Sequence, residues 1–368
     1  MRSGSRGIIV VAVSLMEWRR TLQRSLVLSG ATCFLALCAG ARVGAQQLPE
    51  RMVPAEVERA SAPHEIVEGT FAGVLFSLRV DPPAVDGKYR QPYRAACLVY
   101  PAQSAGGVVT AYARRFAVYV PDADALPVAR RVARMLLLLY GLSRERMRFD
   151  HARDAPTVQV WLTRGPGQGL DPGIAGEQFR NQIYLYDLYA ERRGVEWIRQ
   201  IAHEYGHYAL PGVSGFAEPE EWGNGMLGER LYVKWLVEAL QEGHVKADAV
   251  PFATPEEVRA YAGGQVVPLI ERIARDGVHV RQLTRRDAEG MRAFAGLALY
   301  VDAVYGSEML RMGFAYASSG RNDAFLTAVD FLRGVEAALG AANDLILRPP
   351  LQETTGRRQI FYVYLPRG

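Results

Sequence analysis

Between residues 64 and 120 the apolar residues come in short runs that are rich in β-branched and aromatic side chains. The runs FAGVLFSLRV, YRAACLVYP and VVTAYARRFAVYV are separated by the segments DPPAVDGK and PAQSAGG, which are rich in turn-forming residues. Short apolar runs between turn segments are typical of β-strands. This part of the chain is therefore predicted to be β-rich.

Farther along the chain, apolar residues recur every three to four positions, which is the period of a helix. The pattern predicts a helix over Ala125–Tyr140 and two strands over 158–163 and 182–188, around the glycine-rich segment RGPGQGLDPGIAG. A further helix is predicted over about 195–210, ended by Pro211-Gly212. Beyond residue 225 the chain is predicted to be mainly helical, over 226–241, 255–275, 287–304, 307–318 and 322–339, before a last strand over 359–366.

These elements predict an α+β fold in which a mixed sheet and a helix form the core. The expected organisation is a signal segment over 1–45, a β-rich portion over 46–120 that packs on a core over 121–213, a helical lobe over 214–345, and a C-terminal strand within 346–368.

The N-terminus has the features of an export signal. A basic stretch after Met16, itself a candidate start, precedes an apolar run from about Leu26 to Ala39. Small residues then lead to a predicted cleavage site after Ala45. We expect a secreted or periplasmic protein without a membrane span after cleavage; an uncleaved membrane anchor is the alternative, although the run is short for one.

Composition and charge exclude several classes of protein. The 368 residues, 49% hydrophobic and 22% charged, are those of a globular protein. The formal charge is +4, but residues 1–45 hold six Arg and one acidic residue, and without them acidic residues outnumber basic ones by one. No electrostatic case for binding nucleic acid or a membrane surface then remains. Cys97 would be the only cysteine after cleavage, and we expect it to be a buried apolar residue.

The helix predicted over 195–210 carries the sequence His203-Glu204-Tyr205-Gly206-His207. Residues four apart lie on the same face of a helix, so His203 and His207 can bind one Zn²⁺. Glu204 would then lie beside the open position of the metal, where a carboxylate can act as general base toward water. The alternative is an exposed helix with incidental histidines.

The third ligand decides the class of metal site. The downstream carboxylates are Glu218, Glu220 and Glu221 in the segment AEPEEW, which we expect to be solvated, and Glu229 in an apolar helix. An inward carboxylate about 20 residues after the motif suits a two-His, one-Glu site. Glu229 is therefore the preferred third ligand, with Glu218 and Glu221 as alternatives.

Residues of about 110–235 resemble the gluzincins, which are thermolysin-like and aminopeptidase-like metallopeptidases, and the peptidase MA-like group. The resemblance depends on the order of elements, on HEYGH at 203–207, on WGNGMLGE at 222–229 and, more weakly, on ALYVDAVYGSEMLRM at 298–312. It implies a zincin-like core with His203 and His207 as ligands of one catalytic Zn²⁺ and Glu204 as the base. Gly225 occupies the position where the family pattern has a ligand carboxylate.

The sequence therefore predicts an exported zinc peptidase that cleaves peptide or protein substrates, with Tyr300 as the first candidate for stabilising an oxyanion. Tyr305, Tyr232, His244 and His279 remain alternatives to Tyr300. The competing hypothesis is a non-catalytic zinc-binding or scaffold module that keeps the fold.

Overall fold

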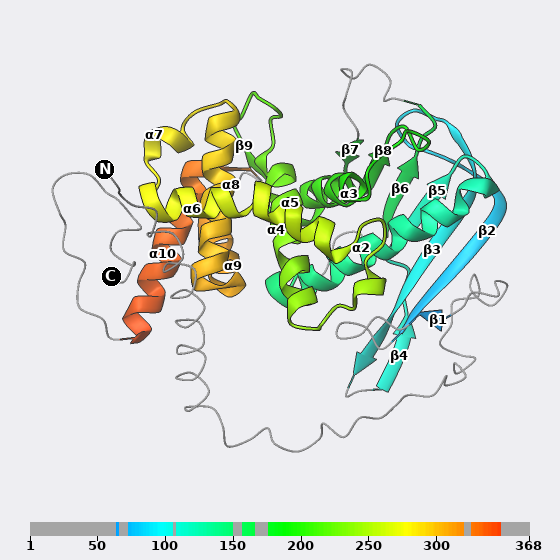
Figure 1. Cartoon of the computed structure of the whole chain (residues 1–368), viewed down its shortest axis with the longest axis horizontal. Helices are drawn as coiled ribbons and strands as arrows, with labels where there is room; N and C mark the ends of the chain where they lie inside the picture. The colour runs from blue at the N-terminus through cyan, green and yellow to red at the C-terminus, as the bar shows by residue number, and fades with distance from the viewer. Residues whose placement is uncertain are drawn as a thin grey trace, which may run out of the picture. The chain divides into compact units, whose positions relative to one another are not determined.

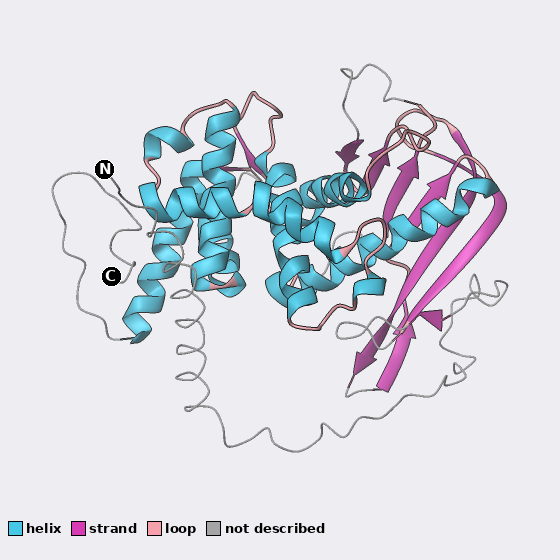
Figure 2. Ribbon diagram, in the orientation of Figure 1, coloured by secondary structure: helices cyan, strands magenta, loops and turns pink. Residues whose placement is uncertain are grey.

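The protein has an α+β fold, shown in Figures 1 and 2. The structure is a computed structural model that describes residues 64–65, 73–105, 108–149, 157–165, 176–319 and 325–346. The predicted signal segment over 1–45 and the strand predicted over 359–366 lie outside these described residues. No helix in the described part of the chain combines the length and the apolar character needed to cross a membrane.

Within the described ranges, eight strands form a mixed sheet. The strands are β1 His64–Glu65, β2 Val74–Val85, β3 Pro92–Ala105, β4 Val108–Tyr112, β5 Phe116–Val120, β6 Val158–Leu162, β7 Gly176–Phe179 and β8 Gln182–Leu185. Their order is β1-β2-β3-β5-β6-β8-β7, and β4 pairs with β3. The pairs β5–β6 and β6–β8 are parallel, whereas β7 runs antiparallel to β8 at the edge of the sheet.

The β-rich N-terminal portion and the core share this one sheet. Strand β5 pairs with β6 with Phe116 opposite Val158, and the sheet therefore continues across the expected boundary near residue 120. We had expected the N-terminal portion to pack on the core rather than to extend its sheet. The difference arises because strand pairing depends on backbone hydrogen bonds, which the apolar pattern does not specify.

The two faces of the sheet are covered differently. Helix α2 (Leu126–Met147) and helix α3 (Gly194–Ala209) pack on one face, as Figure 2 shows. The other face carries an aromatic cluster of Tyr93, Trp161, Tyr184 and Tyr186. Strands β5 and β6 are consequently buried along nearly their whole length. Burial on both faces explains why these strands are almost continuously apolar.

The C-terminal half of the described chain is helical, as expected. Its helices are α4 Gly223–Gln241, α5 Pro255–Gln265, α6 Val267–Asp276, α7 Val280–Leu283, α8 Ala288–Tyr305, α9 Ser307–Ser318 and α10 Ala328–Ile346. The single helix expected over 255–275 is two helices, because Pro268, in the first turn of α6, has no N–H to continue the hydrogen bonds of α5. A short parallel pair, β9 (Val213–Ser214) with β10 (Leu326–Thr327), joins the segment after α3 to the start of α10.

Helices α3 and α4 cross with their backbones in contact. An ideal Cβ on Gly206 would lie 2.7 Å from the Cα of Gly228, and one on Gly228 would lie 2.5 Å from the Cα of Gly206. Real Cβ atoms are not found at such distances, so both positions need glycine. This close crossing places the N-terminal half of α4 directly against the last turns of α3.

A buried ion pair joins α4 to α8. The Lys234 ammonium lies 2.6 Å from Oδ2 of Asp302, which also accepts a hydrogen bond of 3.0 Å from the indole Nε1 of Trp235. Asp302 is 2% exposed. A buried charge that loses its partner is costly, so this pair makes the packing of α8 on α4 specific.

Substituting Asp302→Ala should lower the free energy of unfolding by about 1–3 kcal/mol, because Lys234 would keep only Glu238 at 2.8 Å and the buried Nε1 of Trp235 would lose its acceptor. The measurement is urea denaturation followed by circular dichroism. The exposed Asp276→Ala is the matched control, which should change stability by less than about 0.5 kcal/mol. An Asp302→Ala variant as stable as this control would show that the ion pair between Lys234 and Asp302 does not stabilise the fold.

Candidate metal centre

Helix α3 presents one face to the core and the other to a cleft. Trp197, Ile198 and Ile201 are buried on the core side. The helix begins after Arg193, whose backbone N–H donates to the Glu196 carboxylate, and ends at Leu210, before Pro211. The cleft side carries residues spaced three and four apart: Glu196, Arg199, Gln200, His203, Glu204 and His207. The amphipathic pattern of α3 therefore determines which of its side chains face the cleft.

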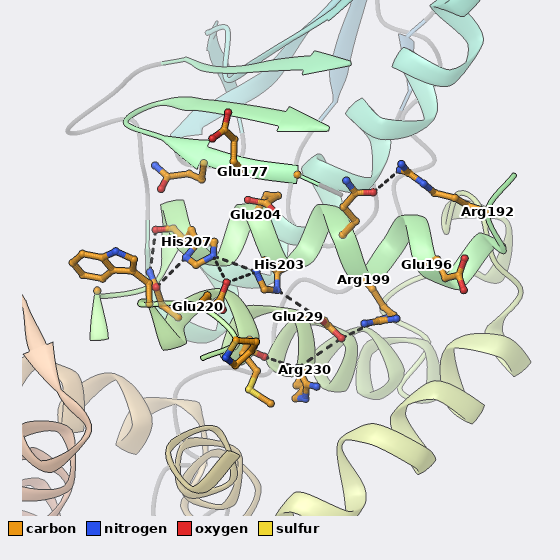
Figure 3. A pocket seen from close by; sticks show the side chains of 18 of the residues that line it. Glu177, Arg192, Glu196, Arg199, His203, Glu204, His207, Glu220, Glu229 and Arg230 are labelled. Atoms are coloured by element: carbon orange, nitrogen blue, oxygen red, sulfur yellow. Dashed lines mark hydrogen bonds and ion pairs between the residues drawn. The ribbon is translucent and has the colours of Figure 1, made fainter. Parts of the chain in front are cut away.

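The cleft has a volume of about 1090 Å³ and follows this face of α3 (Figure 3). Its walls come from β7, from the loop that precedes α4, and from the first turns of α4 itself. Figure 3 shows Glu177 of β7 on one side of α3, and Glu220, Glu229 and Arg230 on the other.

Three donor atoms converge in the cleft. Nε2 of His203 and Nε2 of His207 are 3.2 Å apart, and Oε2 of Glu220 lies 3.0 Å from the first and 3.3 Å from the second. Ligand atoms about 2.0–2.1 Å from a tetrahedral ion lie roughly 3.3 Å from one another. The two nitrogens and one oxygen therefore have the mutual spacing that a zinc ion requires.

Both imidazoles are oriented through their other ring nitrogen. Nδ1 of His207 lies 3.1 Å from Oδ1 of Asn224, and Nδ1 of His203 lies 3.5 Å from Oε2 of Glu229. An acceptor at Nδ1 holds the proton there and leaves the lone pair of Nε2 for a metal. Asn224 also donates to the carbonyl oxygens of His207 and Leu210, and so fixes the end of α3 against α4.

Gly225 lies against the two imidazoles. A Cβ at this position would be 2.7 Å from Nε2 of His203 and closer still to Nε2 of His207. The first turn of α4 therefore faces the two imidazoles without a side chain at position 225. The carboxylate that lies beside both Nε2 atoms comes from Glu220 in the preceding loop.

The carboxylates around the imidazoles have shifted pKa values. Burial would raise the pKa of Glu220, but its contacts with His203 and His207 outweigh burial and lower the pKa to about 2. The pKa of Glu229 is likewise lowered to about 2 against the effect of burial, by His203 and by Arg230 and Arg199. Both carboxylates are thus held as anions beside the imidazoles.

Glu204 has a different environment. Its carboxyl is buried and lies against β7, where a Cβ on Gly176 would be 2.8 Å from Oε1. Burial raises the pKa of Glu204 to about 7, and the two imidazoles act in the opposite direction. A carboxyl with a pKa near neutrality can both accept and return a proton.

The structure places Glu229, the expected third ligand, behind His203 rather than beside the Nε2 atoms. Its oxygens face Nδ1 of His203, Nε of Arg199 at 2.9 Å, and the hydroxyl of Tyr261. Glu218 and Glu221, the alternative ligands, are exposed on the loop that carries Glu220. Glu220 was expected to be solvated, because the sequence does not show that this loop folds back over α3.

Tyr300 is not brought to the cleft. It is 1% exposed in α8, its ring packs edge-on with Tyr305, and it does not line the cleft in the part of the chain that the structure describes. Burial raises its pKa to about 12. The helix that carries Tyr300 directs this position into the core, and the weak resemblance over 298–312 that favoured it does not show which way a side chain faces.

Comparison of the chain with models of known protein families gives no match, and a search of curated proteins finds no relative. The geometry of the centre is therefore the basis for its interpretation. Two imidazole nitrogens and one carboxylate oxygen together can bind a divalent ion, and a buried carboxyl of near-neutral pKa can accept and release a proton next to it.

The purified chain should bind one Zn²⁺, and Glu220→Gln should weaken that binding more than Glu229→Gln does. For Glu229→Gln, which alters the contact with Nδ1 of His203 but leaves the three converging donor atoms in place, we expect a loss of about 10- to 100-fold. Competition against a chromogenic chelator measures both affinities. Glu221 is exposed on the same loop, so the control variant Glu221→Gln should bind zinc like the wild type. If Glu229→Gln proves the more damaging of the two, Glu220 is not the third ligand.

Substituting Gly225→Ala should abolish zinc binding while leaving the fold intact, because the new methyl group meets imidazole rings rather than backbone. Zinc content and thermal melting of the metal-free protein are the two readouts. Gly263→Ala, on an open surface of α5, is the matched control and should keep full zinc content. Normal zinc content in Gly225→Ala would show that the metal position is elsewhere.

Proposed function

We propose that this protein is a zinc-dependent peptidase with His203, His207 and Glu220 as metal ligands and Glu204 as general base. The observation that supports the proposal is the convergence of two Nε2 atoms and one carboxylate oxygen, at 3.0–3.3 Å from one another, in a cleft that also holds a buried carboxyl. The resemblance of residues 110–235 to the gluzincins agrees with it.

Zinc bound to these three side chains would supply Lewis acidity toward a carbonyl oxygen and toward water. Glu204 accepts the proton of the attacking water, because its carboxyl is buried and close to neutral pKa. The same carboxyl then returns the proton to the leaving amine. Asn224 and Glu229 keep the two imidazoles in place through their Nδ1 atoms.

The edge strand β7 supports a peptide as the substrate. It pairs only with β8 among the described strands, and Gly176, Glu177 and Gln178 line the cleft. An extended peptide can therefore lie along β7 and use its backbone hydrogen-bonding groups. Such a peptide would pass over the Nε2 atoms of the two histidines. Export through the segment 1–45 is part of the proposal, and its test is the N-terminal sequence of the exported protein.

The variant Glu204→Gln should keep its zinc and lose peptidase activity by about 10²–10⁴-fold or more, since glutamine cannot accept the proton. Hydrolysis of an unstructured protein such as casein, measured with zinc content in the same samples, tests this. Glu196→Gln, which lies on the same face of α3 two turns earlier, is the control for charge removal and should retain its zinc. A wild type that binds zinc and hydrolyses nothing would instead favour the non-catalytic zinc module.

A further inference from the structure

The cleft continues past the metal position toward the N-terminal end of α3, and this part is rich in arginine. Arg199 lies one helical turn before His203, Arg192 lies two residues before the first residue of the helix, and Arg230 enters from α4. Figure 3 shows Arg192 and Arg199 on the same side of His203. Three guanidinium groups therefore line one half of the cleft.

These arginines are only partly neutralised. Arg199 and Arg230 share the single carboxylate of Glu229, at 2.9 Å and 3.7 Å respectively. Two other acidic residues lie near this end: Glu196 pairs with Arg193, which is 82% exposed and does not line the cleft, and Asp187 acts on Arg192 through its charge. Positive charge thus exceeds negative charge among the described residues at this end.

Arg192 is held in place by neutral groups. Its NH1 donates to Oε1 of Gln200 at 2.5 Å, its NH2 donates to the carbonyl oxygen of Tyr186, and its guanidinium lies 4.7 Å above the ring of Trp197. Within the described ranges no carboxylate forms an ion pair with it. Burial lowers its pKa, and the charges of Asp187 and Glu196 offset only part of this effect.

Arg199 and Arg230 also have N–H groups that can donate hydrogen bonds to a ligand. Arg199 uses its Nε for Glu229 and also interacts with Tyr261, and a guanidinium with five N–H groups keeps further donors beyond these two partners. Nε of Arg230 is buried without a hydrogen-bond partner in the described chain. Guanidinium groups fixed in this way and left with unused N–H donors match a carboxylate, which accepts two parallel hydrogen bonds.

We propose that Arg192 and Arg199 form a subsite that binds a carboxylate of the substrate, and so make the protein selective for peptides with an acidic group on one side of the scissile bond. The proposal rests on the proposed peptidase function. Arg199 precedes His203 by four residues, about 6 Å along the helix. An extended peptide rises about 3.4 Å per residue, so the carboxylate would belong to a residue about two positions from the metal.

The carboxylate can come from an Asp or Glu side chain or from the C-terminus of the peptide. We favour neither on structural grounds, because both present the same oxygen pair. The test therefore uses two sets of fluorescent peptides on one neutral background. In the first set a single Glu is moved along the peptide and compared with Gln at the same place; in the second set a free C-terminus is compared with an amide.

Binding is measured by fluorescence anisotropy with the zinc-loaded full chain carrying Glu204→Gln, so that no peptide is cleaved. Glu at one position, or the free C-terminus, should bind about 10- to 100-fold more tightly than its neutral counterpart, as expected for hydrogen bonds between charged groups. Adding Arg192→Gln should abolish this preference. Adding Arg193→Gln, which removes the neighbouring exposed charge, should leave it unchanged.

A variant that retains the charge distinguishes loss of the subsite from misfolding of the protein. Arg192→Lys keeps the cation but not the planar pair of donors, and should show a preference between those of the parent and Arg192→Gln. Equal binding of acidic and neutral peptides in both sets, or a preference that survives Arg192→Gln in a folded protein, would overturn the proposal. Carboxylate preference without hydrolysis by the wild type would leave the subsite standing and reject the peptidase function.

Discussion

The backbone contact between Gly206 and Gly228 is the constraint on which the centre depends. A Cβ on either glycine would lie 2.5–2.7 Å from the Cα of the other, so α3 and α4 can approach this closely only without side chains. One turn before Gly228, Gly225 then meets the imidazoles, while Asn224 and Glu229 reach the Nδ1 atoms. The helix crossing thus orients both histidines, and the Glu220 loop completes the donor set.

Glu229 connects the metal centre to the arginine-lined half of the cleft. Its two oxygens contact Nδ1 of His203 on one side and Arg199 on the other. A carboxylate bound by several donors is held as an anion, in agreement with its lowered pKa. Glu229, which was expected to be a ligand, therefore lies between His203, a proposed ligand, and the arginines of the proposed carboxylate subsite.

Much of the fold could be predicted from the apolar pattern, and the exceptions have physical reasons. The helices around 195–210 and 226–241 and the strands near 158 and 182 lie close to the expected positions, because burial of one face leaves a clear periodicity. Strand β7 was not predicted, because its four residues follow a glycine-rich segment and are only partly buried. Yet this edge strand lies against Glu204 and lines the cleft.

The sequence by itself determined that His203 and His207 share one face of a helix, because a spacing of four residues is a local property of helical geometry. It could not determine the carboxylate that joins them. The apolar helix around Glu229 favoured that residue over Glu218, Glu220 and Glu221, but only the path of the loop before α4 brings Glu220 to 3.0–3.3 Å from both Nε2 atoms. The same holds for Tyr300 and for Arg192: whether a side chain faces the core or the cleft depends on how distant helices pack, which is decided by the tertiary structure.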